Sequence, residues 1–248
     1  MTRLEPDTKA TIEAYVGQVV RWNSQINLVS RQETGDRLSR LTDQCVDGFE
    51  SLASTMNTEL ISRPMVLYFD LGSGGGFPGI IWHCLLSSRS ISHRTWLVEP
   101  REKRAWFLQR QASLPGIEPF EVIRGRWGES FARVTVQTSQ DVAPPLFLVS
   151  LKALHLTDTE VLEGLVSFMA DADMGDVEVP GARMVAIARY YPGGTLLADE
   201  LCKKLHIGPA GEFCRAGAVD FVTQSSESIA VGAETCPSAN LILSSYLF

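Results

Sequence analysis

Residues 66–79, with the sequence Val-Leu-Tyr-Phe-Asp-Leu-Gly-Ser-Gly-Gly-Gly-Phe-Pro-Gly, constrain the fold of this chain more than any other segment. The apolar run that ends at Asp70 is typical of a buried parallel strand. A glycine-rich loop follows, and the apolar segment from Ile80 to Leu86 is typical of a helix. A strand, a glycine loop and a helix in this order predict a doubly wound α/β domain. Such a domain binds a nucleotide-like ligand at the carboxyl edge of its sheet.

The glycine spacing leaves two ligand classes open. Gly74, Gly76 and Gly79 match the Gly-x-Gly-x-x-Gly pattern of dinucleotide sites. Asp70 lies before the loop, however, where a carboxylate would face a cation or a hydroxyl group rather than a pyrophosphate. The next expected strand ends at Glu99, about twenty residues after the loop, which suits a ribose diol in either class. Asp-x-Gly-x-Gly followed by a strand-end acid resembles the pattern of class I S-adenosylmethionine-dependent methyltransferases, and we favour that ligand.

The bulk composition excludes several classes of protein. The chain has 248 residues, 45% of them hydrophobic, and this length suits one α/β domain with a helical appendage. No apolar run reaches the roughly 18–20 residues that span a bilayer, and residues 1–10 lack the apolar core of a secretory signal. The 5 cysteines are scattered and odd in number, which indicates reduced thiols rather than a zinc site or a disulfide framework. We therefore expect a cytoplasmic protein with no membrane segment and no metal.

The order of expected elements indicates one main sheet. Helical periodicity covers residues 7–28 and 35–55, and no strand precedes Val66. Strands are then expected at 66–70, 95–99, 120–124, 146–150 and 183–189, followed by helices or helical turns near 78–87, 101–113, 128–133, 157–170 and 195–205. Repeated strand–helix units predict a parallel sheet. The tail shows two or three further strand patterns, at 218–223, 228–231 and 240–246.

Together, these patterns resemble the fold of class I methyltransferases, which is the fold that we expect. The fold is Rossmann-like, with a seven-stranded and mostly parallel sheet. We expect an N-terminal helical extension over residues 1–62 and the Rossmann-like methyltransferase domain over residues 63–248.

Four segments form a specific combination: Arg21–Leu28 (Arg-Trp-Asn-Ser-Gln-Ile-Asn-Leu), Asp70–Gly79, Lys103–Leu108 and Gly125–Glu129. Together they resemble the RsmG (GidB) family of 16S ribosomal RNA guanine-N7 methyltransferases, and the match covers roughly residues 12–190. The resemblance implies S-adenosylmethionine as the cofactor and small-subunit ribosomal RNA as the methyl acceptor.

The cofactor site expected from the loop and from the resemblance has several parts. Asp70 would accept a hydrogen bond from the cofactor's ammonium group, with capping of the loop amides as the structural alternative. Glu99 offers acceptor oxygens to the ribose hydroxyls, and the glycine amides would meet the methionine moiety and the ribose. Arg126 and Trp127 would lie beside the adenine, although Trp127 suits a core position equally well. The expected cofactor-binding residues are Asp70, Gly72, Ser73, Gly74, Gly76, Phe77, Glu99, Pro100, Arg126, Trp127 and Ser150.

The chain departs from the family pattern where the methyl acceptor is expected. Residues 44–48 lack the family's histidine and serine, and Lys152 and Arg189 stand near the family's cations after the fourth and fifth strands. Guanine N7 needs no general base, because its lone pair already lies in the base plane, so positioning dominates. A cation that pairs with guanine O6 would supply such positioning. Lys152 and Arg189 are therefore the candidate catalytic residues, with ordinary strand-end cations as the alternative.

The charge balance keeps rival functions open. A formal net charge of −7 argues against tight, non-specific binding of nucleic acid by this chain alone. A local basic face around Arg101, Arg104, Arg124, Lys152 and Arg189 would favour RNA, whereas such cations are often a solvated helix face. The expected function is methylation of an RNA base, with small-subunit ribosomal RNA as partner. The alternatives are a cofactor-binding accessory or regulatory subunit of a protein assembly, and a methyltransferase for another RNA, a protein or a small molecule.

Overall fold

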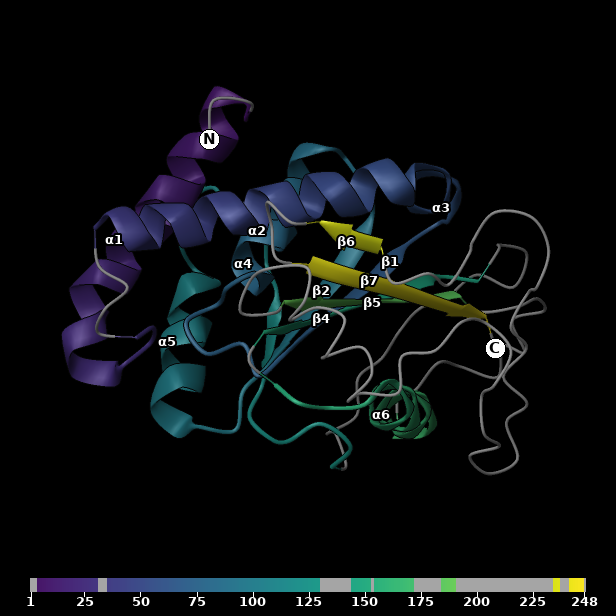
Figure 1. Cartoon of the computed structure of the whole chain (residues 1–248). Coiled ribbons are helices and arrows are strands. Elements are labelled where there is room, and N and C mark those ends of the chain that lie inside the picture. Colours follow the sequence, from purple (N-terminus) through teal and green to yellow (C-terminus); the bar gives the residue numbers. More distant parts are fainter. Residues whose placement is uncertain are drawn as a thin grey trace.

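The computed structural model describes residues 4–30, 35–129, 144–152, 154–171, 184–190, 234–236 and 241–247. The described strands form one seven-stranded sheet in the order β3-β2-β1-β4-β5-β7-β6 (Figure 1). Their bounds are β1 (Val66–Leu71), β2 (His93–Val98), β3 (Glu121–Ile123), β4 (Leu146–Lys152), β5 (Met184–Tyr190), β6 (Glu234–Cys236) and β7 (Leu241–Leu247). Strands β1 to β5 pair in parallel, and β7 runs antiparallel to both β5 and β6. This architecture confirms the predicted mostly parallel, seven-stranded sheet.

Helices cover both faces of the sheet. They are α1 (Pro6–Ile26), α2 (Asp36–Thr55), α3 (Asn57–Ser62), α4 (Gly79–Ser88), α5 (Glu102–Gln111) and α6 (Asp158–Asp171). The first five helices share one hydrophobic cluster, and α6 packs into a second cluster on the opposite face (Figure 1). Alternate residues of β1 divide between these clusters, as a pleated strand requires: Tyr68 lies in the first, Leu67 and Phe69 in the second.

The N-terminal helices are part of the same core as the sheet. Ile12 and Tyr15 of α1 and Phe49 of α2 are fully buried in the cluster that contains Tyr68 of β1 and Leu148 of β4. Burial of each such side chain stabilises the fold by about 1.5–3 kcal/mol. The helical extension therefore stabilises one face of the sheet, and the division of the chain at residue 62 stays a prediction.

The elements match the expected ones within about two residues wherever both are described. Two short elements, α3 and β6, were not expected from the sequence. The expected strands near 218–223 and 228–231, the expected helix near 195–205 and most of the expected turn near 128–133 fall outside the described residues. No helix within the described ranges has both the length and the apolar character needed to cross a membrane.

Candidate functional site

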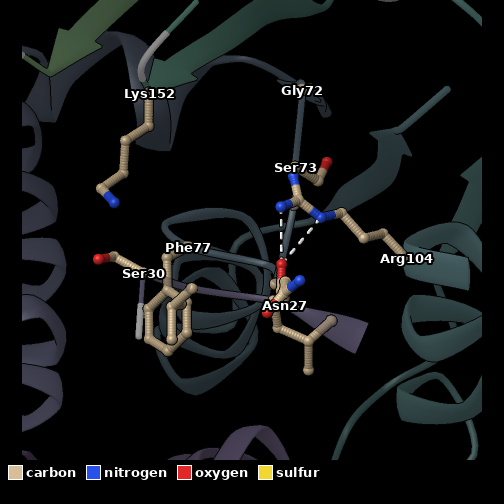
Figure 2. A pocket seen from close by; sticks show the side chains of 11 residues that line it. Asn27, Ser30, Gly72, Ser73, Phe77, Arg104 and Lys152 are labelled. Carbon is tan, nitrogen blue, oxygen red and sulfur yellow. Dashed lines mark hydrogen bonds between the residues drawn. The ribbon is translucent and has the colours of Figure 1, made fainter. Parts of the chain in front are cut away.

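A cavity of about 610 Å³ lies at the carboxyl ends of β1 and β4 (Figure 2). This is the edge at which ligands bind in open α/β sheets. Four parts of the chain line it, namely the segment after α1, the glycine loop, α5 and the end of β4. The lining residues are Asn27, Leu28, Val29, Ser30, Gly72, Ser73, Gly74, Gly75, Phe77, Arg104 and Lys152.

The segment after α1 is held across the glycine loop by hydrogen bonds. Asn27 ends α1 in the left-handed conformation (φ 53°, ψ 60°) that commonly terminates helices. Its carbonyl oxygen accepts two hydrogen bonds from Arg104, at 3.1 Å from Nε and 2.7 Å from Nη2 (Figure 2). The Asn23 side chain accepts from the Val29 N–H at 2.9 Å. These contacts bring residues 27–30 into the site. None of these residues was expected there from the sequence.

Gly75 packs against both α1 and the segment that follows it. The Tyr15 hydroxyl donates to the Gly75 carbonyl oxygen at 2.6 Å in the buried interior. A Cβ atom at Gly75 would lie only 3.1 Å from the Leu28 carbonyl oxygen and 3.2 Å from the Leu28 Cβ. Glycine at this position therefore lets the α1 segment close one side of the cavity.

The amides of the glycine loop donate within the protein. The N–H of Gly72 donates to the Val98 carbonyl at 2.9 Å, and that of Gly76 donates within the loop at 2.7 Å. The N–H of Gly74 donates to Glu99 Oε2 at 2.8 Å. The expectation that these amides face the ligand is therefore corrected, because each N–H has one hydrogen to donate. The loop residues Gly72 to Gly75 still line the cavity, and their small side chains leave it open.

Glu99 joins the loop to the start of α5. Its side chain is buried (3% exposed), and its two oxygens accept from the N–H groups of Gly74 and Arg101 at 2.8 and 2.9 Å. An ionised carboxylate has about four lone-pair sites, so Glu99 keeps acceptor capacity. Glu99 does not line the cavity itself, but it bonds Gly74, which does. Pro100, also expected in the cofactor site, is exposed next to it.

Asp70 lies beneath the cavity rather than on its lining. It is buried (1% exposed), and the Ser150 hydroxyl donates to its Oδ1 at 2.5 Å. Ser150 also hydrogen-bonds the Tyr68 hydroxyl at 2.9 Å. Asp70 Oδ2 faces the first turn of α4, where a Cβ atom on Gly79 would come within 2.5 Å of it. The loop amides of Gly72, Gly74 and Gly76 donate elsewhere, so capping of these amides by Asp70 is not seen. Asp70 Oδ2 has no hydrogen-bond partner among the described residues, and its contact with the ammonium group stays a prediction. Ser150 does not line the cavity.

Burial raises the pKa of Asp70 to about 6, opposed by its hydrogen bond from Ser150. The folded protein then holds a proton that the unfolded chain releases near its ordinary pKa of 3.8. The stabilisation by this proton is complete below pH 3.8 and is lost as pH rises through 6.

We therefore expect Asp70 to lower the free energy of unfolding by about 2 kcal/mol as pH rises from 4 to 7. Urea unfolding of the wild type and Asp70→Asn at pH 4, 5, 6 and 7 measures this effect, because all other carboxylates cancel in the difference between the two proteins. If the difference in unfolding free energy between the two proteins did not vary with pH, the raised pKa of Asp70 would be contradicted.

The two candidate catalytic cations lie on opposite faces of the sheet. Lys152, at the end of β4, lines the cavity with its side chain directed into it (Figure 2). Arg189 of β5 is buried (2% exposed) and hydrogen-bonds Asp158 at the start of α6, with Nε to Oδ1 at 2.9 Å. The expectation that Arg189 lies beside the acceptor is therefore corrected, because its charge is neutralised inside the protein. Lys152 remains as the candidate.

Neither of the two residues expected beside the adenine, Arg126 and Trp127, lines the cavity. Trp127 donates from Nε1 to the Val161 carbonyl at 3.1 Å and packs edge-on against Phe69, in the cluster beneath α6. The N–H of Arg126 donates to Glu129 Oε2 at 3.0 Å at an exposed turn. Trp127 is therefore partly buried against the core under α6, close to the core position that the sequence left open. Among the described residues, no three His, Cys, Asp or Glu side chains gather in a way that could hold a metal ion.

Comparison with known proteins gives the family. The family model described as "rRNA small subunit methyltransferase G" matches residues 8–155, which is more than half of the chain. The chain belongs to this family. The match spans α1, the glycine loop, α5 and β4, and so includes every segment that lines the cavity.

Curated relatives carry the same family name. The "Ribosomal RNA small subunit methyltransferase G" of Rhodopseudomonas palustris (strain BisB18) is 28% identical over 174 residues, covering 65% of this chain and 69% of the relative. That of Cereibacter sphaeroides (strain ATCC 17025) is 28% identical over 180 residues, covering 72% and 79%.

Likeness to solved structures is weak. An rRNA methylase from Streptococcus thermophilus has a TM-score of 0.35 at 17% identity, covering 80% of this chain and 93% of that one. The magnesium protoporphyrin IX methyltransferase of Synechocystis with bound S-adenosylmethionine has a TM-score of 0.38 at 9% identity, covering 99% and 98%. Scores this low decide nothing about the fold, which follows from the strand order itself.

Proposed function

We propose that this chain transfers a methyl group from S-adenosylmethionine to a base of small-subunit ribosomal RNA. The observation that supports this most is the cavity at the carboxyl edge of β1 and β4, with the glycine loop on one side and the Lys152 cation on the other. Membership of the rRNA small subunit methyltransferase G family supports the reaction and the class of acceptor.

The residues of the site fit the cofactor. The volume of about 610 Å³ lies within the range of about 300–1,000 Å³ typical of small-molecule sites. Glu99 is fixed by two backbone N–H groups and retains lone pairs for a ribose diol. We assign Glu99, Phe77 and residues 72–75 to cofactor binding. S-adenosylmethionine, when bound, supplies a methyl group activated by its sulfonium.

We assign Lys152 to the acceptor side of the cavity. Arg104, the other cation of the lining, has two of its N–H groups bonded to the Asn27 carbonyl, whereas the Lys152 side chain extends into the cavity. An ammonium group that donates to guanine O6 would orient the base and leave N7 free to attack. The chain then needs to position two reactants and exclude water, without a general base.

Replacing Glu99 by glutamine is expected to weaken S-adenosylmethionine binding at least tenfold, which is about 1.4 kcal/mol. The amide nitrogen of glutamine donates, so one of the two bonds from Gly74 and Arg101 is lost, together with an acceptor for the ribose. Isothermal titration calorimetry measures the affinity. Glu129→Gln is the matched control, because Glu129 also accepts a backbone N–H but lies at an exposed turn. Unchanged affinity in Glu99→Gln would show that the cofactor site is misplaced.

The reaction is tested with deproteinised small-subunit ribosomal RNA from a strain that lacks this gene. We expect transfer of label from methyl-labelled S-adenosylmethionine to this RNA, and recovery of N7-methylguanosine on nucleoside analysis. Binding of the cofactor without transfer to RNA would instead support an accessory subunit of a protein assembly. Label on another base would support the RNA methyltransferase assignment and exclude guanine N7 as the methyl acceptor.

A further inference from the structure

Two tryptophans and an arginine form an exposed cluster where α1 and α5 pack together. The rings of Trp22 and Trp106 meet edge to face, with centroids 5.1 Å apart. The Arg110 guanidinium carbon lies 5.2 Å from the Trp106 ring centroid and 6.0 Å from that of Trp22. Trp106 is 40% exposed, so a large part of its ring faces solvent.

Two exposed cations of α5, Lys103 and Arg110, flank Trp106 in a chain whose net charge is −7. Lys103, Trp106 and Arg110 are three and four residues apart on α5, so they share one side of the helix. No salt bridge within the described part of the chain involves Lys103 or Arg110. Glu102, the acid of the first turn of α5, lies 3.6 Å from Arg124 next to β3. We call Trp22, Lys103, Trp106 and Arg110 the α1–α5 surface.

The α1–α5 surface adjoins the cavity. Arg104 lines the cavity and binds the Asn27 carbonyl, which joins α5 to the end of α1 at that point. At 1.5 Å per residue, Trp22 lies about 8 Å from Asn27 along α1, and Arg110 about 9 Å from Arg104 along α5. A polymeric substrate whose reacting unit enters the cavity would therefore pass over these side chains within a few of its own units.

We propose that the α1–α5 surface binds RNA that flanks the target base, through stacking on Trp106 and contact of Lys103 and Arg110 with phosphate. This proposal rests on the proposed function. Exposed aromatic rings stack on unpaired bases, and arginine and lysine neutralise phosphates, so the combination fits single-stranded RNA. A buried core position would account for Trp22 alone, but it would not account for the exposed Trp106 ring between two cations.

Two variants test the stacking and the charge separately, with deproteinised small-subunit ribosomal RNA as the probe. Trp106→Leu keeps an apolar contact for Trp22 and removes the stacking ring, and Arg110→Gln removes one charge. We expect each to weaken RNA binding about tenfold at fixed salt. Arg110→Gln should also reduce the slope of log affinity against log salt by about 1, whereas Trp106→Leu should leave that slope unchanged.

S-adenosylmethionine affinity should stay at the wild-type value in both variants, which shows that they fold. Lys9→Gln is the matched charge control, because the half-exposed Lys9 lies on α1 about 20 Å along the helix from Trp22. Wild-type RNA binding by both variants would overturn the surface proposal and leave the methyltransferase assignment intact. A loss seen only with intact ribosomal subunits would assign the surface to a protein partner and overturn the RNA proposal. A wild-type chain that neither binds nor methylates the RNA would remove both proposals.

Discussion

Replacement of Lys152 by glutamine is expected to lower kcat/KM for RNA methylation by about 10- to 100-fold and to leave S-adenosylmethionine affinity unchanged. The range corresponds to the loss of about 1–3 kcal/mol when a charged contact to a base edge is removed. Lys152 extends into the cavity from the end of β4, opposite the segment after α1 (Figure 2). Arg104, the other cation of the lining, donates two hydrogen bonds to the Asn27 carbonyl. Methyl-transfer kinetics with varied RNA, together with calorimetry for the cofactor, measure the two effects.

Controls separate a local effect of this change from a general loss of charge. Lys9→Gln removes the same charge on the exposed surface of α1 and should retain wild-type kinetics. Lys152→Arg retains a cation and should recover a large part of the activity lost in the glutamine variant. A Lys152→Gln protein that loses cofactor affinity in parallel with activity would assign Lys152 to the cofactor. Wild-type kinetics would exclude it from the site.

The central part of the sheet was predictable because the sequence marks its buried parallel strands with apolar runs. Strands β1 and β4 are covered on both faces, so nearly all their residues are buried and the runs are continuous. The glycine loop marks the carboxyl end of β1, which fixes the edge of the sheet where the cavity lies. β6 has only three described residues, too few for periodicity to identify.

The α1 side of the cavity was not predictable from local patterns. It depends on the hydrogen bonds between Arg104 and the Asn27 carbonyl, which join residues 77 positions apart. It also depends on the left-handed backbone of Asn27 and on the missing side chain at Gly75. In the sequence, Asn27 and Leu28 stood out only as part of the Arg21–Leu28 segment, and that pattern does not show what the segment covers.

The roles of the two candidate cations depend on strand register. Residues 151 and 189 are partners in the pairing of β4 with β5, and so are residues 152 and 190. Arg189 therefore shares a face with Leu151 in the cluster under α6, whereas Lys152 shares the cavity face with Ser150. A shift of one residue exchanges the faces of a strand. The sequence alone placed both cations at the correct edge of the sheet. Without the register of β4 against β5, it could not assign each cation to a face.

A methyl group added at Gly76 is expected to lower the free energy of unfolding by about 2–5 kcal/mol and to abolish cofactor binding. The backbone at Gly76 has φ +94°, outside the ordinary range of residues with a side chain, which costs about 1–2 kcal/mol. Its Cβ would lie 2.7 Å from Ile80 Cδ1 and 2.9 Å from the Tyr15 hydroxyl, and overpacking in a closed core costs about 1–3 kcal/mol more. Tyr15 has no room to yield, because its hydroxyl is bonded to the Gly75 carbonyl at 2.6 Å.

Gly17→Ala supplies the matched control, since the same methyl group there has nothing within 4 Å and lies inside α1. Alanine favours a helix over glycine by about 0.8–1 kcal/mol, so this variant should be more stable than the wild type. Urea unfolding measures the change in the free energy of unfolding of each variant, and calorimetry measures cofactor affinity. If Gly76→Ala were as stable as the wild type, the loop would have changed its conformation at no cost in free energy. The close packing of α1 on the loop would then not determine the shape of the cavity. A loss of stability in Gly76→Ala together with a gain in Gly17→Ala would show that the added methyl group acts through its position. The loss would then be assigned to the packing of Tyr15 against the glycine loop.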